Sequence, residues 1–118
     1  MTDAFVLFHN PRCSKSRAAL ALLESRGVTP RIVHYLDAAP DADTLRGLLR
    51  RLDLPARGLL RTGESAYATL GLDDGTLGED AIIDAMAAHP ELIERPILVR
   101  GQRAVIGRPT ERLLALLD

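Results

Sequence analysis

The spacing of apolar residues over the first part of the chain constrains the fold more than any other feature. Residues 5–8 form a short continuous apolar run, typical of a strand covered on both faces, and apolar residues recur on one broad side of a predicted helix over 14–26. Gly27 is expected to end that helix, and a second strand is predicted over 31–36. Because a helix connects the two strands, we expect them to be parallel, as in a βαβ unit.

The pattern over residues 41–93 indicates helices. Leucines repeat at the i, i+3, i+4, i+7 spacing from Leu45 to Leu52, and Asp43 or Thr44 offers a cap for that helix. Further short helices are predicted after Pro55, over 64–70 and over 79–88, with a turn at Asp73-Asp74-Gly75.

The last part of the chain returns to a strand pattern. Strands are predicted over 97–100 and 103–106, joined by Gly101-Gln102 as a two-residue hairpin turn, and a final helix is predicted to start at Pro109. The predicted order is therefore β-α-β, a helical segment, then β-β-α. With 118 residues, 47% of them hydrophobic, the chain is expected to fold as a single domain over 1–118 around one core.

Charge and composition argue against two classes of partner. The chain has 15 basic and 16 acidic residues and a formal charge of −1, so no overall field draws it to nucleic acid or to a membrane surface. The N-terminus lacks the basic and apolar regions of a signal peptide, and no apolar run reaches transmembrane length. With a single cysteine, the cytoplasm is the expected compartment.

That cysteine, Cys13, lies where the first predicted strand gives way to the first helix. Ser14 can cap the helix, and the free N–H groups of the first turn would face the sulfur. Arg12, Lys15 and Arg17 add positive charge nearby. These effects favour the thiolate, which is the nucleophilic form of cysteine. The alternative is a buried cysteine that acts as a small apolar residue.

No second cysteine is available to form a disulfide within the chain. Position 16 is serine, so the C-x-x-C arrangement of a thioredoxin-like protein becomes C-x-x-S. If Cys13 is oxidised during turnover, an external thiol must resolve it through a mixed disulfide. Ser16 could donate a hydrogen bond to the thiolate, or it could be an ordinary polar residue of a first helical turn.

Four segments, in order along the chain, resemble the glutaredoxin-type arsenate reductases and their close paralogues. They are His9-Asn10-Pro11-Arg12-Cys13-Ser14-Lys15-Ser16-Arg17, Leu59-Leu60-Arg61, His89-Pro90 leading into Glu94-Arg95-Pro96-Ile97, and Ile106-Gly107-Arg108-Pro109. The resemblance implies an α/β thioredoxin/glutaredoxin-like fold. Its four-stranded mixed sheet would have the order 4-3-1-2, with flanking helices and a helical insertion over roughly 41–93 between the second and third strands.

The resemblance also implies roles for individual residues. Cys13 would attack an oxyanion that Arg61, Arg95 and Arg108 bind. Guanidinium groups suit this task because they grip paired oxygens in bidentate fashion and stabilise a neighbouring thiolate. Arg95 and Arg108 each precede a proline, which restrains them to an extended backbone, whereas Arg61 lacks that restraint and could be a surface charge.

Supporting roles follow from the same motif. By resemblance, Pro96 is expected to follow a cis peptide bond beside the thiol. His9 could tune the thiolate or shape the turn before it, whereas His34 and His89 are expected to be structural. With one cysteine and three scattered histidines, no set of residues has the spacing of metal ligands.

The implied activity is reduction of arsenate to arsenite, with glutathione as external reductant, a glutaredoxin as partner and no bound cofactor. No nucleotide or flavin motif occurs. One departure is the Ser-Lys-Ser sequence after Cys13, where the arsenic-resistance enzymes have Gly-Thr-Ser. Two alternatives therefore stay open: a glutathione-dependent thiol-disulfide oxidoreductase with a different substrate, and a redox-responsive transcription regulator. The lone cysteine argues against the regulator, which usually needs both cysteines of C-x-x-C.

Overall fold

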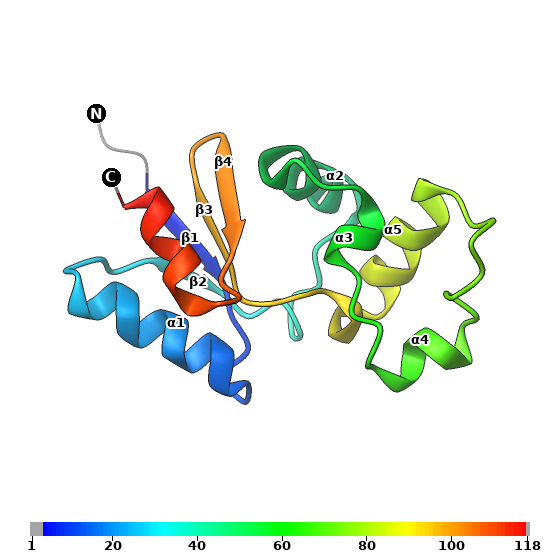
Figure 1. Ribbon diagram of the computed structural model, residues 1–118, viewed down its shortest axis with the longest axis horizontal. Coiled ribbons are helices and arrows are strands. Elements are labelled where there is room, and N and C mark those ends of the chain that lie inside the picture. The colour runs from blue at the N-terminus through cyan, green and yellow to red at the C-terminus, as the bar shows by residue number, and fades with distance from the viewer. Residues whose placement is uncertain (1–3, 118) are drawn as a thin grey trace. The chain divides into compact units, whose positions relative to one another are not determined.

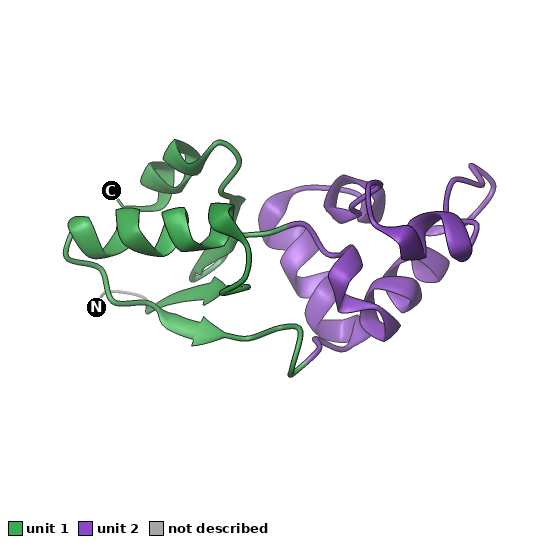
Figure 2. Cartoon of the chain, turned by 90° about the horizontal axis from the view of Figure 1, so that it is seen from below, with its two compact units in different colours: residues 1–38, 95–118 green, residues 39–94 purple. Residues whose placement is uncertain are grey.

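The computed structural model describes residues 4–117 of the chain. They form two compact units, one from residues 4–38 and 95–117 and the other from residues 39–94 (Figure 2). The helical segment predicted over 41–93 falls within the second unit. Met1 to Asp3, on which the expectation of no signal peptide partly rests, lie outside the described residues. No helix among the described residues is both long and apolar enough to cross a membrane.

The first unit contains a four-stranded mixed sheet in the order β2-β1-β3-β4 (Figure 1). β1 is parallel to β2 and antiparallel to β3, and β3 and β4 form an antiparallel hairpin. This is the predicted order 4-3-1-2 counted from the other edge, so the predicted sheet is confirmed. The strands are β1 (Phe5–Phe8), β2 (Arg31–Val33), β3 (Ile97–Arg100) and β4 (Arg103–Ile106).

Two helices of this unit pack on one face of its sheet. They are α1 (Ser14–Ser25) and the 3₁₀ helix η2 (Thr110–Leu116). Leu7 and Leu98 are paired across β1 and β3, so their side chains share one face, and both are fully buried against the helices. The residues of this core are Leu7, Ala19, Leu23, Leu98, Leu113 and Leu116. Burial of such side chains stabilises a fold by about 1.5–3 kcal/mol each.

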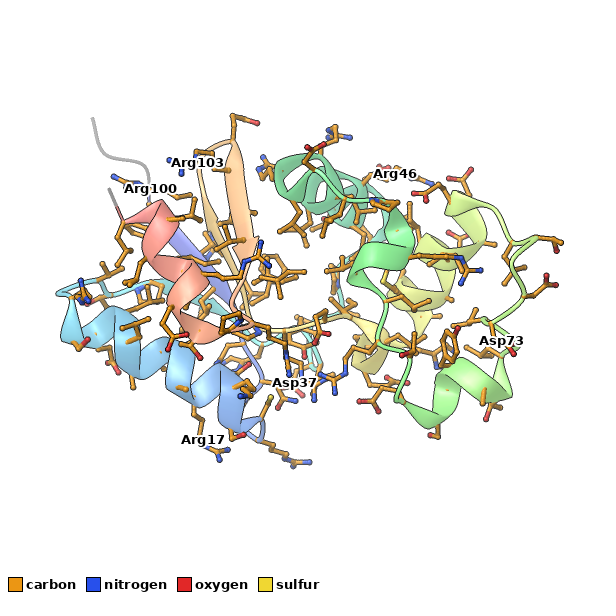
Figure 3. The ribbon with its side chains drawn as sticks, viewed as in Figure 1. Arg17, Asp37, Arg46, Asp73, Arg100 and Arg103 are labelled. Atoms are coloured by element: carbon orange, nitrogen blue, oxygen red, sulfur yellow. The ribbon has the colours of Figure 1, made fainter. Side chains whose placement is uncertain are left out.

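Arginines of the hairpin bind the C-terminal end of η2. Arg100 donates from Nη1 to the carbonyl oxygen of Leu116 at 2.7 Å, and Arg103 donates from Nη2 to that of Ala115 at 2.8 Å. Figure 3 shows both side chains beside this helix. They satisfy carbonyl groups that the end of a helix leaves without a partner.

The second unit is helical. It contains α2 (Ala42–Leu52), α3 (Ala56–Leu59), α4 (Ser65–Thr69), α5 (Glu79–Ala88) and the 3₁₀ helix η1 (Pro90–Leu92). Helix α5 packs against α2, α3 and η1 through the buried side chains of Ile82, Ile83 and Met86. An ion pair also links α2 to α5 at the surface. Nη2 of Arg46, which is labelled in Figure 3, lies 3.1 Å from Oδ1 of Asp80.

Three predicted boundaries are wrong by a few residues. β2 ends at Val33 and not at residue 36, because the carbonyl oxygen of His34 accepts hydrogen bonds from the N–H groups of Asp37 and Ala38 and turns the chain. The cap of α2 is Asp41, which accepts from the Thr44 N–H at 2.8 Å. The last helix starts at Thr110, with Pro109 preceding it.

Candidate active site

Asn10 fixes the loop that joins β1 to α1. Its side-chain oxygen accepts from the Arg12 N–H at 3.0 Å, and its carbonyl oxygen accepts from the Cys13 N–H at 3.0 Å. Its own N–H donates to the Ser16 hydroxyl at 3.3 Å. Both Asn10 and Ser16 are buried. The loop is therefore held in one conformation by hydrogen bonds within its own sequence, which places Cys13 at the start of the helix.

Cys13 is the N-cap residue of α1, and Ser14, which was expected to cap, is the first helical residue. The prediction of a Ser14 cap is wrong because the chain enters the helix one residue earlier. Burial raises the pKa of the Cys13 thiol, but hydrogen bonds from the backbone N–H of Ser16, from Arg95 and from the backbone N–H of Lys15 lower it. Together with the charge of Arg95, they bring the pKa to about 7.

The two Arg-Pro segments of the first unit meet at the Cys13 sulfur. Arg108 donates from Nη2 to Sγ at 3.9 Å, and its Nε donates to the carbonyl oxygen of Arg95 at 2.7 Å. The Arg95-Pro96 peptide bond is cis, as the resemblance implied, and the bond between Arg108 and the next proline is also cis. The structure thus brings Cys13, Arg95 and Arg108 together, as the sequence comparison implied.

The cations near the sulfur differ from those that the local sequence suggested. Lys15 contributes its backbone N–H, and Arg17 donates from Nη1 to the carbonyl oxygen of Pro11 at 2.9 Å. Arg17 therefore closes the loop. The side chains that contact the thiol belong to Arg95 and Arg108, more than eighty positions away in sequence. Only the family motif pointed to them, since proximity along the chain favours the wrong residues.

Ser16 and His9, two of the predicted supporting residues, are both buried. The Ser16 hydroxyl accepts from the Asn10 N–H and so supports the loop, and a bond from Ser16 to the thiolate stays a prediction. His9 is only 5% exposed, and its ring centroid lies 6.2 Å from that of His34. Burial, followed by the charges of His34 and Arg17, lowers the pKa of His9 below its ordinary value. His9 is therefore neutral at physiological pH.

Arg61 belongs to the second unit, where a short backbone pairing positions it. Leu60 and Ile93 form an antiparallel bridge, and the Arg61 N–H donates to the carbonyl oxygen of Leu92 at 2.7 Å. The Arg61 side chain is 22% exposed, and its guanidinium group has two carboxylate neighbours. Its Nη1 lies 3.2 Å from Oε1 of Glu94 and its Nε 3.3 Å from Oε1 of Glu64. These ion pairs were not foreseen, and the oxyanion-binding role of Arg61 stays a prediction.

The arrangement around Cys13 suits nucleophilic attack on an anion. The thiol ionises near neutral pH, and two guanidinium groups lie beside it that could hold a negatively charged oxygen. Among residues 4–117, no group of three histidine, cysteine or acidic side chains is arranged to hold a metal ion.

Comparison with known proteins identifies the family of the chain. The ArsC family matches residues 8–116 of the chain. The protein named arsenate reductase of Neisseria meningitidis serogroup A is 49% identical over 112 residues, covering 94% of this chain and 96% of that protein. The arsenate reductase of Escherichia coli K12 is 38% identical over 111 residues, covering 94% and 79% of the two chains.

A solved structure extends the similarity to the fold. The arsenate reductase from Vibrio cholerae superposes with a TM-score of 0.94 at 44% identity and covers 98% of each chain. Its likeness confirms the expected thioredoxin-like α/β fold. The match over residues 8–116 includes Cys13 and all three arginines of the predicted site. The chain therefore belongs to the ArsC family of arsenate reductase relatives.

Proposed function

We propose that the protein reduces arsenate to arsenite, with Cys13 as nucleophile and with glutathione and a glutaredoxin as the source of electrons. Membership of the ArsC family supports an oxyanion substrate. Relatives that share 38–49% of their residues with this chain bear the name arsenate reductase. The dependence on glutathione and glutaredoxin is supported by the lone cysteine, which needs an external thiol to complete a redox cycle.

The observation that carries the proposal is the contact of Arg95 and Arg108 with a thiol whose pKa is about 7. At that pKa, a large fraction of Cys13 is thiolate at neutral pH. The same guanidinium groups can transfer hydrogen bonds to the oxygens of a bound oxyanion, which gains negative charge during attack. One pair of side chains would thus serve both the nucleophile and its target.

The proposed reaction has three steps. The Cys13 thiolate forms a bond to arsenic(V), and one oxygen leaves as water after protonation. Glutathione then forms a disulfide with Cys13, and the electron pair of the sulfur–arsenic bond stays with arsenic, so that arsenite is released. A glutaredoxin thiol finally takes the glutathionyl group and restores Cys13. Arsenic gains the two electrons that the two sulfur atoms lose.

The direct test measures arsenite formed from arsenate in the presence of glutathione and glutaredoxin. Wild type should turn over, and Cys13→Ser should not. Arg108→Leu should lower kcat/KM by at least about tenfold, which corresponds to about 1.4 kcal/mol of transition-state stabilisation. Arg26→Leu is the matched control, because Arg26 is an exposed arginine at the end of α1 in the same unit. Equal turnover by Arg108→Leu and wild type would contradict the proposal.

The same protein preparations distinguish arsenate reduction from the alternative activity, thiol-disulfide exchange. The Ser-Lys-Ser sequence after Cys13 is the feature that favours a thiol-disulfide oxidoreductase. In that case wild type would form no arsenite, yet it would exchange glutathione mixed disulfides through Cys13. A stable disulfide with another protein as the sole oxidised product would instead favour a redox regulator.

A further inference from the structure

A cavity of about 230 Å³ lies beside the loop that carries Cys13, within the first unit. Its lining comes from residues 9–12 of the loop and from His34, Leu36 and Asp37, which follow β2. The two segments are neighbours because β1 and β2 are parallel and their C-terminal ends meet, where the His9 N–H donates to the carbonyl oxygen of Val33 at 2.9 Å. The carboxyl ends of parallel strands are a common location for ligand sites.

Both walls of the cavity are fixed by hydrogen bonds. Asn10 holds the loop through its bonds to Arg12 and Cys13, and the carbonyl oxygen of His34 accepts from the N–H groups of the two residues at the end of the turn, each at 3.0 Å. A ligand would therefore meet a preformed surface, and little conformational entropy would be lost on binding.

The lining carries one positive and one negative side chain, and neither is paired within the part of the chain that the structure describes. Arg12 and Asp37 are both exposed, and within residues 4–117 neither side chain has a hydrogen-bond or ion-pair partner. Asp37 is labelled in Figure 3. By contrast, Arg17 of the same loop region is bound to a carbonyl oxygen. A cation and an anion that border one cavity suit a ligand that itself carries both charges.

The buried and apolar parts of the lining point to the same kind of ligand. His9 is 5% exposed, and its Nδ1 has no hydrogen-bond partner among the described residues. Leu36 is 40% exposed and offers an apolar surface beside Pro11. A volume of about 230 Å³ is below the roughly 300–1,000 Å³ that encloses a whole drug-sized ligand, so the cavity would hold one end of a larger molecule.

We propose that this cavity binds the γ-glutamyl end of glutathione, with the carboxylate on Arg12 and the ammonium group on Asp37. The inference rests on the proposed function, because it assigns a location to the thiol that resolves Cys13. A guanidinium binds a carboxylate through two parallel hydrogen bonds, and the methylene groups of the glutamyl chain would lie on Leu36. Arg12 directly precedes Cys13, so the bound tripeptide would be tethered next to the nucleophile.

Two unreactive probes test the site. S-methylglutathione carries both charges but cannot form a disulfide, and its N-acetyl derivative lacks the ammonium group. We expect S-methylglutathione to shift the amide resonances of residues 9–12 and 34–37 in an NMR titration. Arg12→Gln and Asp37→Asn should each weaken its Kd by about fivefold, as for a partly exposed ion pair of up to about 1 kcal/mol. Wild type should bind the N-acetyl probe more weakly than S-methylglutathione, whereas Asp37→Asn should bind both equally.

Matched controls are Arg26→Gln and Asp84→Asn, which remove the same charges from exposed positions on α1 and α5. Both should keep the wild-type Kd. The proposal is overturned if wild type binds the two probes equally, if either cavity variant binds as tightly as wild type, or if the shifted resonances lie elsewhere. Arsenate is absent from this titration, so its result is separate from turnover: probe binding without arsenite formation would refute only the proposed function.

Discussion

The ionisation of Cys13 depends on the backbone N–H groups of α1 and on the side chain of Arg95. Arg95 contributes both a hydrogen bond and a charge to the lowered pKa of the thiol. We expect the rate of alkylation by iodoacetamide to follow a pKa of about 7 in wild type. Arg95→Leu should raise that pKa by about one unit, because a hydrogen bond from a charged group is worth about 1.5–3 kcal/mol and this site is partly open to water.

The control for this titration is Arg26→Leu, which should leave the alkylation profile unchanged. If Arg95→Leu and wild type have the same profile, Arg95 does not lower the pKa of Cys13, and the backbone N–H groups of α1 and Arg108 are left as its hydrogen-bond donors. That outcome would leave the thiolate in place but remove Arg95 from its stabilisation.

A second residue-scale prediction concerns Glu94. Its carboxylate accepts from Nη1 of Arg61 at 3.2 Å. If Arg61 binds arsenate, this carboxylate competes for the same donor and repels the anion. Glu94→Gln keeps an acceptor and removes the charge, so we expect the KM for arsenate to fall by about two- to fivefold with kcat little changed.

Glu24→Gln removes the same charge from an exposed position of α1 and should leave KM unchanged. A higher KM in Glu94→Gln would mean that Glu94 orients Arg61 and does not compete with the substrate. Steady-state kinetics over a range of arsenate concentrations separate the two results.

The sequence alone predicted some of the residues of the site and missed others. It found Cys13 from its position before a helix, which is a local signal. It chose Arg12, Lys15 and Arg17 as the nearby cations because they are close along the chain. The contacts come instead from Arg95 and Arg108, since β3 lies beside β1 in the sheet. Such long-range proximity has no local signal, and only the family motif supplied it.

At the scale of elements, the hairpin and η2 meet at Gly107. A Cβ atom at this position would lie 3.0 Å from Cγ of Pro96 and 3.0 Å from Cδ2 of Leu113, which is fully buried. We expect Gly107→Ala to lower the free energy of unfolding by about 1–3 kcal/mol, the usual cost of overpacking a core. Urea denaturation of Gly107→Ala and wild type measures this difference in the free energy of unfolding.

The matched control is Gly63→Ala, because no atom lies within 4 Å of a Cβ placed at Gly63. That variant should unfold at nearly the wild-type urea concentration. Equal stability of both variants would show that Leu113 or Pro96 can move without cost, so that the close approach at Gly107 is not required.

Element types were easier to predict than element ends. The apolar periodicity identified every strand and the helical character of the middle segment. The end of β2 was missed because His34-Tyr35-Leu36 continues a strand-like composition, while a turn through the His34 carbonyl interrupts the pairing. The leucine spacing after Pro109 fits an α-helix as well as the 3₁₀ helix that forms, so periodicity could not distinguish them.

At the scale of the whole molecule, the residues of the proposed chemistry are divided between the two compact units. Cys13, Arg95 and Arg108 belong to one, and Arg61 belongs to the other. The predicted strand order accounts for the first three, because it places the segments around β1 and β3 side by side. That the chain folds as a single domain stays a prediction.

The lowered pKa of Cys13 also links folding to pH. The pKa of the thiol is about 7 in the folded chain, and in the unfolded chain it has the higher, ordinary value of cysteine. Below about pH 7 the group is protonated in both states and adds nothing to stability. As pH rises from about 7 to about 9, the folded chain loses its proton first, so ionisation stabilises it increasingly. Above that range both states are ionised and the gain is constant.

We therefore expect wild type to gain free energy of unfolding relative to Cys13→Ser between about pH 7 and pH 9. The serine hydroxyl does not ionise in this range, so all other titrating groups cancel in the difference. Urea denaturation of both proteins at pH 6, 7, 8 and 9 measures it, with a reducing agent present to keep the thiol free. A difference that is constant over this range, or that falls as pH rises, would mean that the folded structure does not favour the Cys13 thiolate.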